Sequence, residues 1–152
     1  MDSDLSNRIA EFISKCRLCT IATVDKNGKP NASTVFIKNI GMDIFFNTTR
    51  DSQKIRNILS NPRVALTMQQ GPPPKTDQEI KGIQYEGIAK VLSDTEIAEA
   101  PKAVMARHKV FNSLKPGQSV IVKVTPLKIY LIDYSRGFRH RDLLQFINGV
   151  IK

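Results

Sequence analysis

The sequence predicts a mainly β protein, a closed or nearly closed antiparallel β-barrel with flanking helices. Six or seven β-type runs follow one another, and helical patterns occur only at the ends and in two connections. Between two of these runs, Asn27-Gly28 is typical of a hairpin. Gly87 lies in the middle of a long run, where a bulge or a bend of the kind used by closed barrels is expected. Because no linker divides the chain, we expect residues 1–152 to form a single domain.

An amphipathic helix is expected at the start, over residues 4–15, and Ser3 or Asp4 can cap it. Its apolar side chains recur at i, i+4, i+7 and i+8, in Leu5, Ile9, Phe12 and Ile13. Two β-type runs follow, "LCTIATV" and "NASTVFI", separated by "DKNGKP". The Asn-Gly pair in this connection predicts a type I′ turn.

A short charged helix is expected between two further strands, "MDIFFNT" and "RVALTMQQ". Within "DSQKIRNILSNP", apolar residues recur at helical spacing in Ile55, Ile58 and Leu59. Asp51 or Ser52 can cap the start, and Asn-Pro ends the pattern, so the helix should have about ten residues.

The second half alternates between loops, strands and short helices. "GPPPKTDQE" is expected to be a loop and "IKGIQYEGIAKVL" a long strand. Residues 94–112 are expected to be helical, with Pro101 opening a second helix. "SVIVKV" and "KIYLID" are expected as two strands around Pro126, and residues 140–148 as a short helix that places Leu143, Leu144 and Ile147 on one face.

The charge balance favours anionic partners. Twenty-three Lys and Arg against 14 Asp and Glu give a net charge of +9, which suits nucleic acid, a membrane surface or phosphorylated small molecules. No apolar run approaches the roughly 20 residues that span a bilayer, and the start "MDSDLSNRIAEF" is acidic and polar. We expect a soluble cytoplasmic protein without a membrane partner.

Cys16 and Cys19 have a spacing that also occurs in zinc sites and dithiol redox motifs. A zinc site would need two more ligands, and His108 and His140 have no paired spacing. A redox pair would normally open a helix, whereas these residues stand where a helix ends and a strand begins. We interpret them as two buried thiols and expect no metal site.

Motifs of common enzymes are absent: there is no GxGxxG, Walker loop, GxSxG or HExxH. Any chemistry should therefore come from a cofactor, and the charged helix offers a place for one. Arg50 and Lys54 stand at its first turn, where the helix dipole is already positive. Two cations beside this positive helix end are electrostatically unfavourable. A bound phosphate would make their position favourable, and the hydroxyls of Thr48, Thr49 and Ser52 would be further donors to it. The alternative is that both cations are solvated surface residues.

The order of these segments resembles the pyridoxamine 5′-phosphate oxidase-like, FMN-binding split β-barrel family, from about Leu18 to Asp142. The most specific match is Thr48, then Ser52-Gln53-Lys54, then Ile58 and Asn61-Pro62 followed by "VAL". The end, "YLIDYSRGFRHRD", resembles a subgroup of small members, of the general-stress or flavin-reductase type, and there Arg136 and Arg139 either line the cofactor cleft or serve solubility. The resemblance implies a six-stranded antiparallel Greek-key split barrel.

The resemblance also implies which residues hold the flavin. Val35, Phe36 and Ile37 would run beside the isoalloxazine ring, Lys38 would approach its pyrimidine edge, and Gln84 would reach the flavin of a neighbouring subunit. The phosphate would be held by Thr48, Ser52 and Lys54, and Asn47, Thr49 and Gln53 complete the expected cofactor-binding set. Ser33 and Gln53 fall where the oxidases proper carry arginines, which speaks against true pyridoxamine phosphate oxidase activity.

These implications lead to a homodimer with two FMN molecules at the subunit interface, acting as a flavin-dependent reductase or oxidase. NADH or NADPH and a small molecule are the expected reactants, and no catalytic residue is assigned. One alternative is a flavin-binding or sensing module without turnover, and another is a member that uses a deazaflavin or haem. A nucleic-acid-binding barrel is disfavoured, because the chain has no Trp and only three Tyr to stack on bases.

Overall fold

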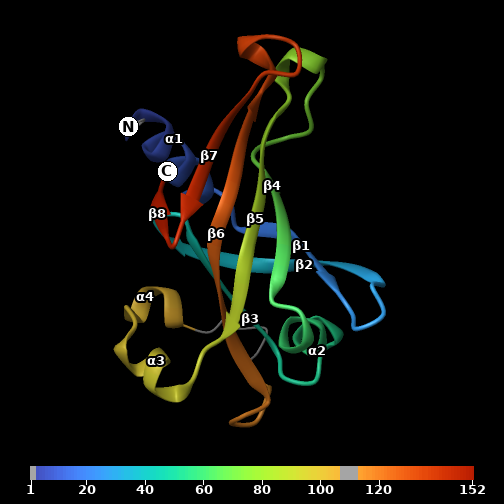
Figure 1. Ribbon diagram of the computed structural model, residues 1–152, viewed down its shortest axis with the longest axis vertical. Coiled ribbons are helices and arrows are strands. Elements are labelled where there is room, and N and C mark those ends of the chain that lie inside the picture. Colours follow the sequence, from blue (N-terminus) through green and yellow to red (C-terminus); the bar gives the residue numbers. More distant parts are fainter. Residues whose placement is uncertain (1–2, 107–112) are drawn as a thin grey trace.

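A closed barrel of six antiparallel strands is the centre of the fold (Figure 1). The computed structural model describes residues 3–106 and 113–152. Around the barrel the strands run in the order β3-β2-β1-β4-β5-β6, and β3 pairs with β6 to close it. This order places β4 beside β1, which is the Greek-key arrangement that the resemblance implied. The strands are β1 (Leu18–Val24), β2 (Pro30–Ile40), β3 (Asp43–Thr49), β4 (Arg63–Gln69), β5 (Lys81–Val91) and β6 (Ser119–Asp133).

The first helix, α1 (Ser3–Ser14), begins one residue earlier than expected and lies beside β7 (Figure 1). The four apolar side chains that predicted it are all buried in the core. The second helix, α2 (Gln53–Ser60), has eight residues rather than about ten, and its N-cap is Ser52. Ile55 and Ile58 are buried, but Leu59 is 71% exposed and takes no part in the core.

The β1–β2 hairpin is present, but its turn type differs from the expected type I′. That turn needs positive φ at both central residues, whereas in this connection only Gly28 has one, +81°. Asp25 O accepts the Gly28 N–H at 3.0 Å, and Gly28 then forms a bulge before Lys29. The carboxylate of Asp25 also accepts the N–H groups of Asn27 and Lys29, at 2.8 and 2.9 Å. This Asx turn favours a type I turn over the mirror-image form.

The expected irregularity at Gly87 is confirmed. The β5–β6 register shifts between Glu86, which pairs with Lys128, and Gly87, which pairs with Pro126. A Cβ atom on Gly87 would lie 2.7 Å from the carbonyl oxygen of Thr125, so only glycine fits. The same shift explains why β6 is one strand of 15 residues, not the two expected: Pro126 cannot donate to the ladder, and a bulge tolerates it.

The predicted C-terminal helix over residues 140–148 is wrong. These residues form β7 (Arg141–Ile147), which pairs with β6, followed by β8 (Val150–Ile151). Leu144 is buried while Leu143 and Ile147 are exposed, which is a strand alternation. Three apolar residues are compatible with both the helical and the strand periodicity. The strand forms because the free edge of β6 provides backbone hydrogen-bond partners.

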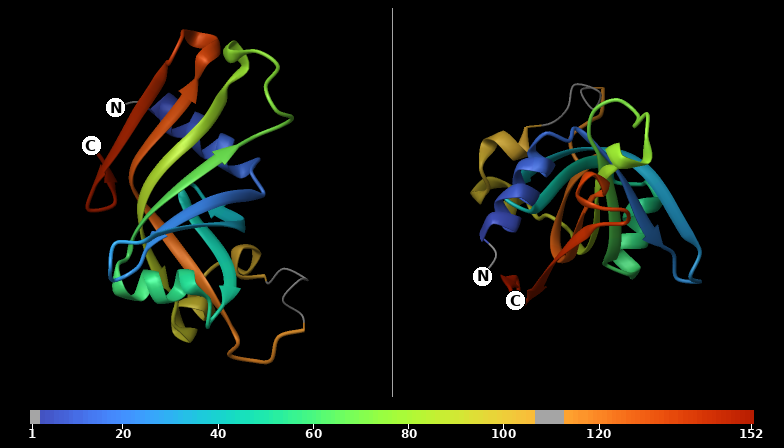
Figure 2. Two further views of the ribbon diagram at one scale, coloured as in Figure 1. Left: turned by 90° about the vertical axis from the view of Figure 1, so that its right-hand side faces the viewer. Right: turned by 90° about the horizontal axis from the view of Figure 1, so that it is seen from above.

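The long connection between β5 and β6 contains α3 (Asp94–Glu99) and α4 (Lys102–Met105). Pro101 is the N-cap of α4, so the expected second helix is confirmed, while the rest of the predicted helical stretch, 107–112, lies outside the described residues. A short 3₁₀ turn, η1 (Asp77–Glu79), occurs in the predicted proline-rich loop and lies next to η3 (Tyr134–Arg136) at one end of the molecule (Figure 2). Among the described helices, none has the length and apolarity needed to cross a bilayer.

Candidate cofactor site

The barrel is split between β2 and β3. The two strands pair only at Ile37–Ile40 with Asp43–Phe46, whereas on its other edge β3 pairs with β6 over Ile44–Thr49, so Asn47–Thr49 have no strand partner on the β2 side among the described residues. The earlier part of β2 pairs with β1 alone, so its other edge has no strand partner in the described structure. Pro30 and Asn31 of this part of β2 line a hollow together with Gln53 and Asn57 of α2. This hollow lies between the start of β2 and the first turns of α2.

Three side chains meet at this helix start. Lys54 Nζ donates a hydrogen bond to Thr48 Oγ1 at 3.2 Å, and Thr48 Oγ1 lies 3.5 Å from Ser52 Oγ. Thr48 is buried, and the other two are half-buried. The Ser52 side chain forms no cap hydrogen bond with the helix. Two hydroxyls and an ammonium group thus converge where a helix begins, which we call the cradle (Thr48, Ser52 and Lys54).

The electrostatics of the cradle favour an anion. Burial lowers the pKa of Lys54, because the charged ammonium group has lost part of its water. None of the ion pairs among residues 3–106 and 113–152 involves Lys54, so no carboxylate offsets this loss. A phosphate would restore the charge balance and accept from the hydroxyls and the first-turn N–H groups. The donor set therefore fits the phosphate end of FMN.

Two of the other predicted polar residues take different directions. Arg50 turns away from the cradle and donates from Nε to Gly117 O at 2.7 Å. Gln53 Nε2 donates to Asn57 Oδ1 at 2.7 Å, so this side chain runs along α2. Asn57 Nδ2 in turn donates to Thr23 Oγ1 at 3.0 Å, and both residues are buried. Sequence reasoning missed this pair, although an Asn one residue before the buried Ile58 was a signal.

Side chains of β2 alternate between the core and the outer surface. Val35 and Ile37 are buried inside the barrel, and the Ile37 N–H donates to Arg17 O at 2.9 Å, whereas Phe36 faces outward and is 40% exposed. Ser33 also points inward, and its buried hydroxyl has no hydrogen-bond partner among the described residues. Lys38 Nζ donates to Ala106 O at 2.7 Å and thereby ties β2 to the end of α4.

The remaining predicted residues are separated by the barrel. Asn47 and Thr49 are half-buried at the end of β3, next to the cradle in sequence. Gln84 is exposed on the outer face of β5. Because β1 and β4 stand between β2 and β5, Gln84 is about 14 Å across the sheet from β2. This separation is consistent with the resemblance, which assigns Gln84 to the flavin of a neighbouring subunit.

Gln84 belongs to a row of paired residues that crosses the outer face of the sheet. None of the six side chains is buried, and four are threonines or aliphatic. In register order the row is Thr34, Thr20, Thr67, Gln84, Tyr130 and Leu143. The row before it begins Ala32, Ala22 and Ala65. Such a face of small and apolar side chains allows another surface to approach closely.

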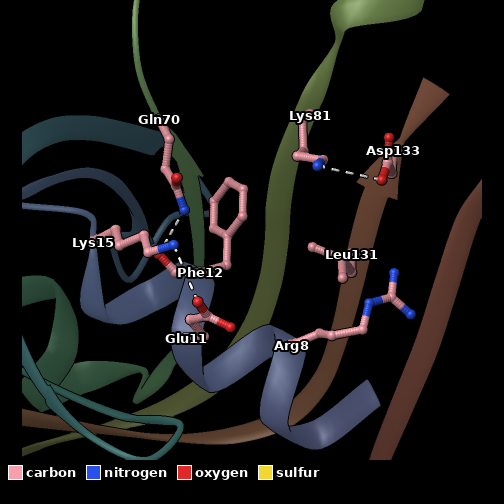
Figure 3. A pocket seen from close by; sticks show the side chains of 8 residues that line it. All are labelled: Arg8, Glu11, Phe12, Lys15, Gln70, Lys81, Leu131 and Asp133. Atoms are coloured by element: carbon pink, nitrogen blue, oxygen red, sulfur yellow. Dashed lines mark hydrogen bonds and ion pairs between the residues drawn. The ribbon is translucent and has the colours of Figure 1, made fainter. Parts of the chain in front are cut away.

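A different hollow lies between α1 and strands β5 and β6 (Figure 3). Here the charges are already paired: Lys15 with Glu11 at 3.1 Å, and Lys81 with Asp133 at 3.5 Å. Gln70 Nε2 donates to Phe12 O at 3.0 Å. Because its cations have carboxylate partners, this hollow suits an anion less well than the cradle does.

The two cysteines are buried thiols. Cys16 Sγ donates to Phe12 O at 3.4 Å, and burial raises the pKa of Cys19 to about 12. Both therefore stay protonated at neutral pH, which disfavours thiolate chemistry. The described residues contain no group of three or more His, Cys, Asp or Glu that could hold a metal ion. The interpretation as small buried side chains agrees with this geometry.

The family model for pyridoxamine 5′-phosphate oxidase matches residues 5–133. The chain belongs to this family. A curated relative, the pyridoxine/pyridoxamine 5′-phosphate oxidase of Shewanella halifaxensis (strain HAW-EB4), is 35% identical over 91 residues, which are 59% of this chain and 39% of the relative. The match therefore spans about two fifths of the length of that oxidase.

Solved structures share the fold at low identity. A heme binding protein from Mycobacterium smegmatis has a TM-score of 0.76 and 15% identity, over 92% of this chain and 57% of that one. General Stress Protein 26 from Bacillus anthracis str. Sterne has a TM-score of 0.67 and 23% identity, over 93% of this chain and 98% of that one. A pyridoxamine 5′-phosphate oxidase-related, FMN binding protein from Nostoc punctiforme PCC 73102 has a TM-score of 0.64 and 14% identity, over 95% of this chain and 88% of that one.

Proposed function

We propose that this member of the pyridoxamine 5′-phosphate oxidase family binds FMN and acts as a flavin-dependent oxidoreductase. The observation that carries the proposal is the half-buried ammonium group of Lys54, which faces Thr48 at a helix start and has no carboxylate partner among the described residues. A bound flavin supplies the electron or hydride transfer for which the chain has no motif of its own.

Residues of this chain bind and orient the cofactor. Lys54 and the hydroxyls of Thr48 and Ser52 hold the phosphate, and backbone groups of the open edge of β2 face the ring. Lys38, whose Nζ donates to Ala106 O in this structure, would be the residue that contacts the pyrimidine edge of the ring. An ammonium group there favours the reduced flavin, which carries negative charge at that edge.

We further propose a homodimer with the cofactor between the subunits. The support is the outer sheet face, where the exposed large apolar side chains include Leu18, Phe36 and Leu143 beside rows of Ala and Thr. A two-fold contact is the commonest way to cover such a face. It would also bring Gln84 of one subunit toward the cofactor of the other. Sedimentation of a monomer of about 17 kDa with FMN fully bound would contradict the dimer.

Haem is a second candidate, because one of the similar structures is a heme binding protein. Of the two histidines, His108 lies outside the described residues, and His140 is placed against Asp142 at 3.2 Å, far along the chain from the cradle. Nothing in the cradle resembles a haem ligand set, whereas its donors suit a phosphate. The absorption spectrum of the purified protein separates the two, because flavin and haem have different visible bands.

The decisive experiment compares FMN with riboflavin by titration. The two differ only by the phosphate, so a cradle that recognises the phosphate should bind FMN at least tenfold more tightly. Equal affinity for FMN and riboflavin would mean that the cradle does not recognise the phosphate. With FMN bound, reduction by NADH or NADPH identifies an enzyme, whereas a sensing module is reduced only by dithionite or light.

A further inference from the structure

The connection between β5 and β6 carries α3 and α4 to the lower end of the barrel in Figure 1. Its first helix is anchored on β5: Lys90 Nζ donates to Glu96 Oε2 of α3 at 2.7 Å, and Ser93 and Glu96 form a capping box. Its second helix packs against β2, and Val104, which is 7% exposed, is the buried residue of α4. Both helices therefore have defined partners in the barrel.

α4 ends with a carbonyl group that contacts β2. The N–H of Ala106 donates to Lys102 O at 3.0 Å and closes the helix, and the backbone of Ala106 then becomes extended, with φ −61° and ψ 125°. Lys38 Nζ donates to the carbonyl oxygen of Ala106 at 2.7 Å. The last carbonyl groups of a helix have no N–H partner within it, so this ammonium group satisfies one of them.

This contact fixes the side chain of Lys38, which would contact the pyrimidine edge of the flavin in the proposed function. A free lysine side chain samples many rotamers, and any contact that fixes it must offset this loss of entropy. An ammonium group has three N–H donors, so two remain for a ring oxygen when one is bound to Ala106 O. Because Coulomb attraction falls with distance, the effect of this charge on the flavin depends on how closely the ammonium group is held.

The acceptor that holds Lys38 is neutral. None of the ion pairs among residues 3–106 and 113–152 involves Lys38. A carboxylate in place of the Ala106 carbonyl would cancel most of the charge of the ammonium group at the ring. A carbonyl oxygen holds the ammonium group and leaves its charge available to stabilise an anionic ring edge.

We propose that α4 is a positioning element for the flavin: Val104 anchors the helix on β2, and Ala106 O then holds the Lys38 ammonium group at the ring. This inference rests on the proposed function, because it needs a flavin whose pyrimidine edge faces Lys38. In this arrangement Val104 and Ala106 act only through Lys38. The β5–β6 connection thereby adjusts the reduction potential of a cofactor to which it contributes no charge of its own.

The first test measures the contact without a cofactor. In the cofactor-free full chain, Lys38→Met removes the donor to Ala106 O. Hydrogen exchange of the α4 amides, measured by mass spectrometry on peptides that cover residues 102–106, should then become at least about threefold faster. Lys75→Met, at an exposed position in the loop before β5, is the control and should leave this rate unchanged. Unchanged exchange in Lys38→Met would mean that the contact does not hold α4, and the inference would be wrong.

The second test measures the reduction potential of bound FMN, which a merely structural role of α4 would not change. Val104→Ser should release α4 from β2 and lower the potential by at least about half of the shift that Lys38→Met produces. Ala106→Pro removes the N–H that closes α4 and disfavours a helical residue before it, so it should act in the same direction. In the Lys38→Met background, Val104→Ser should add less than about a quarter of that shift.

Two variants of the same helix are matched controls for the potential. Val104→Ile keeps an apolar anchor and should keep the wild-type potential. Lys102→Met removes an exposed cation from α4 and should also keep it, because the Lys38 contact is intact. A shift in Lys102→Met as large as that in Val104→Ser would mean that the general field of the helix matters and not its hold on Lys38.

The remaining outcomes separate this inference from the proposed function. If Lys38→Met lowers the potential but Val104→Ser and Ala106→Pro do not, Lys38 acts without α4, and only the positioning role is lost. If Val104→Ser lowers the potential equally with and without Lys38, α4 acts through another group, and the inference is again wrong. If FMN does not bind the wild-type chain, the proposed function fails and the positioning role with it.

Discussion

Lys54 Nζ lies 3.2 Å from Thr48 Oγ1, and this contact joins the end of β3 to the first turn of α2. A lysine at a helix start is normally unfavourable, since the helix dipole is positive there. In this chain it is also half-buried and lacks a carboxylate among the described residues. The arrangement is consistent with a site shaped for a bound anion.

Reversal of this charge should weaken FMN binding. Lys54→Glu removes a charge-assisted contact of about 1.5–3 kcal/mol and adds repulsion, so FMN affinity measured by fluorescence titration should fall at least tenfold. Arg50→Glu is the matched control, because Arg50 stands at the same helix end but donates to Gly117 O. A fall of less than threefold is expected there. Equal losses in both variants would mean that only the general field of the helix start matters.

Lys38 should raise the reduction potential of the bound flavin. Two unit charges about 4 Å apart interact by about 4 kcal/mol at an effective dielectric near 20, and about 1.4 kcal/mol corresponds to 30 mV for a two-electron couple. Lys38→Met should therefore lower the potential by tens of millivolts, with about 90 mV as a ceiling. A potential indistinguishable from wild type would place this lysine away from the ring, at its contact with Ala106.

The buried pair of Asn57 and Thr23 should contribute to stability. Asn57→Ala leaves the Thr23 hydroxyl without the amide that donates to it, which should cost about 1–3 kcal/mol in the free energy of unfolding by urea. Leu59→Ala on the same helix is the control, since Leu59 is 71% exposed, and it should cost less than about 0.5 kcal/mol. Similar costs for both variants would rule out a special role for the pair.

The bulge at Gly87 should not tolerate a side chain. In Gly87→Ala, the new methyl group would lie 2.7 Å from Thr125 O and 2.8 Å from the ring of Tyr85. The first contact is with backbone, which cannot move away without disturbing the β5–β6 pairing, so a loss of about 1–3 kcal/mol in thermal or urea unfolding is expected. Gly71→Ala, where no atom lies near but φ is +70°, separates backbone strain from this clash.

A pH dependence should arise at α3. The ion pair with Lys90, at 2.7 Å, and the Ser93 N–H lower the pKa of Glu96 to about 2 from an ordinary 4.5. A depressed carboxyl pKa contributes stability above about pH 4.5 and loses it as the pH falls toward 2. The unfolding midpoint of Glu96→Gln should therefore depend less on pH between about pH 4.5 and 2 than that of the wild type. Near pH 2 the two midpoints should be equal. Parallel curves for the two proteins would contradict the assignment.

Sequence reasoning reached the barrel and the cradle because both depend on short-range patterns. The alternation within each strand, the position of Gly87 and the apolar stripe of α1 are local, and so is the spacing from Thr48 to Lys54. Lys54 in the helix follows Thr48 at the strand end by only six residues. The backbone between them has little conformational freedom, which favours contact between the two side chains. The match of residues 5–133 to the family model confirms the predicted family.

Only the tertiary structure decided the features that depend on distant partners. The C-terminal segment became β7 because β6 offered an edge, and Pro126 stayed within one strand because the facing Gly87 allowed a bulge. Likewise, Lys38 meets Ala106, which lies 68 residues away, and Arg50 meets Gly117. A sequence determines which backbone conformations have low energy and which side chains are more stable when buried or when paired with another group. Which partner is within reach depends on how the strands close and where they part, here between β2 and β3.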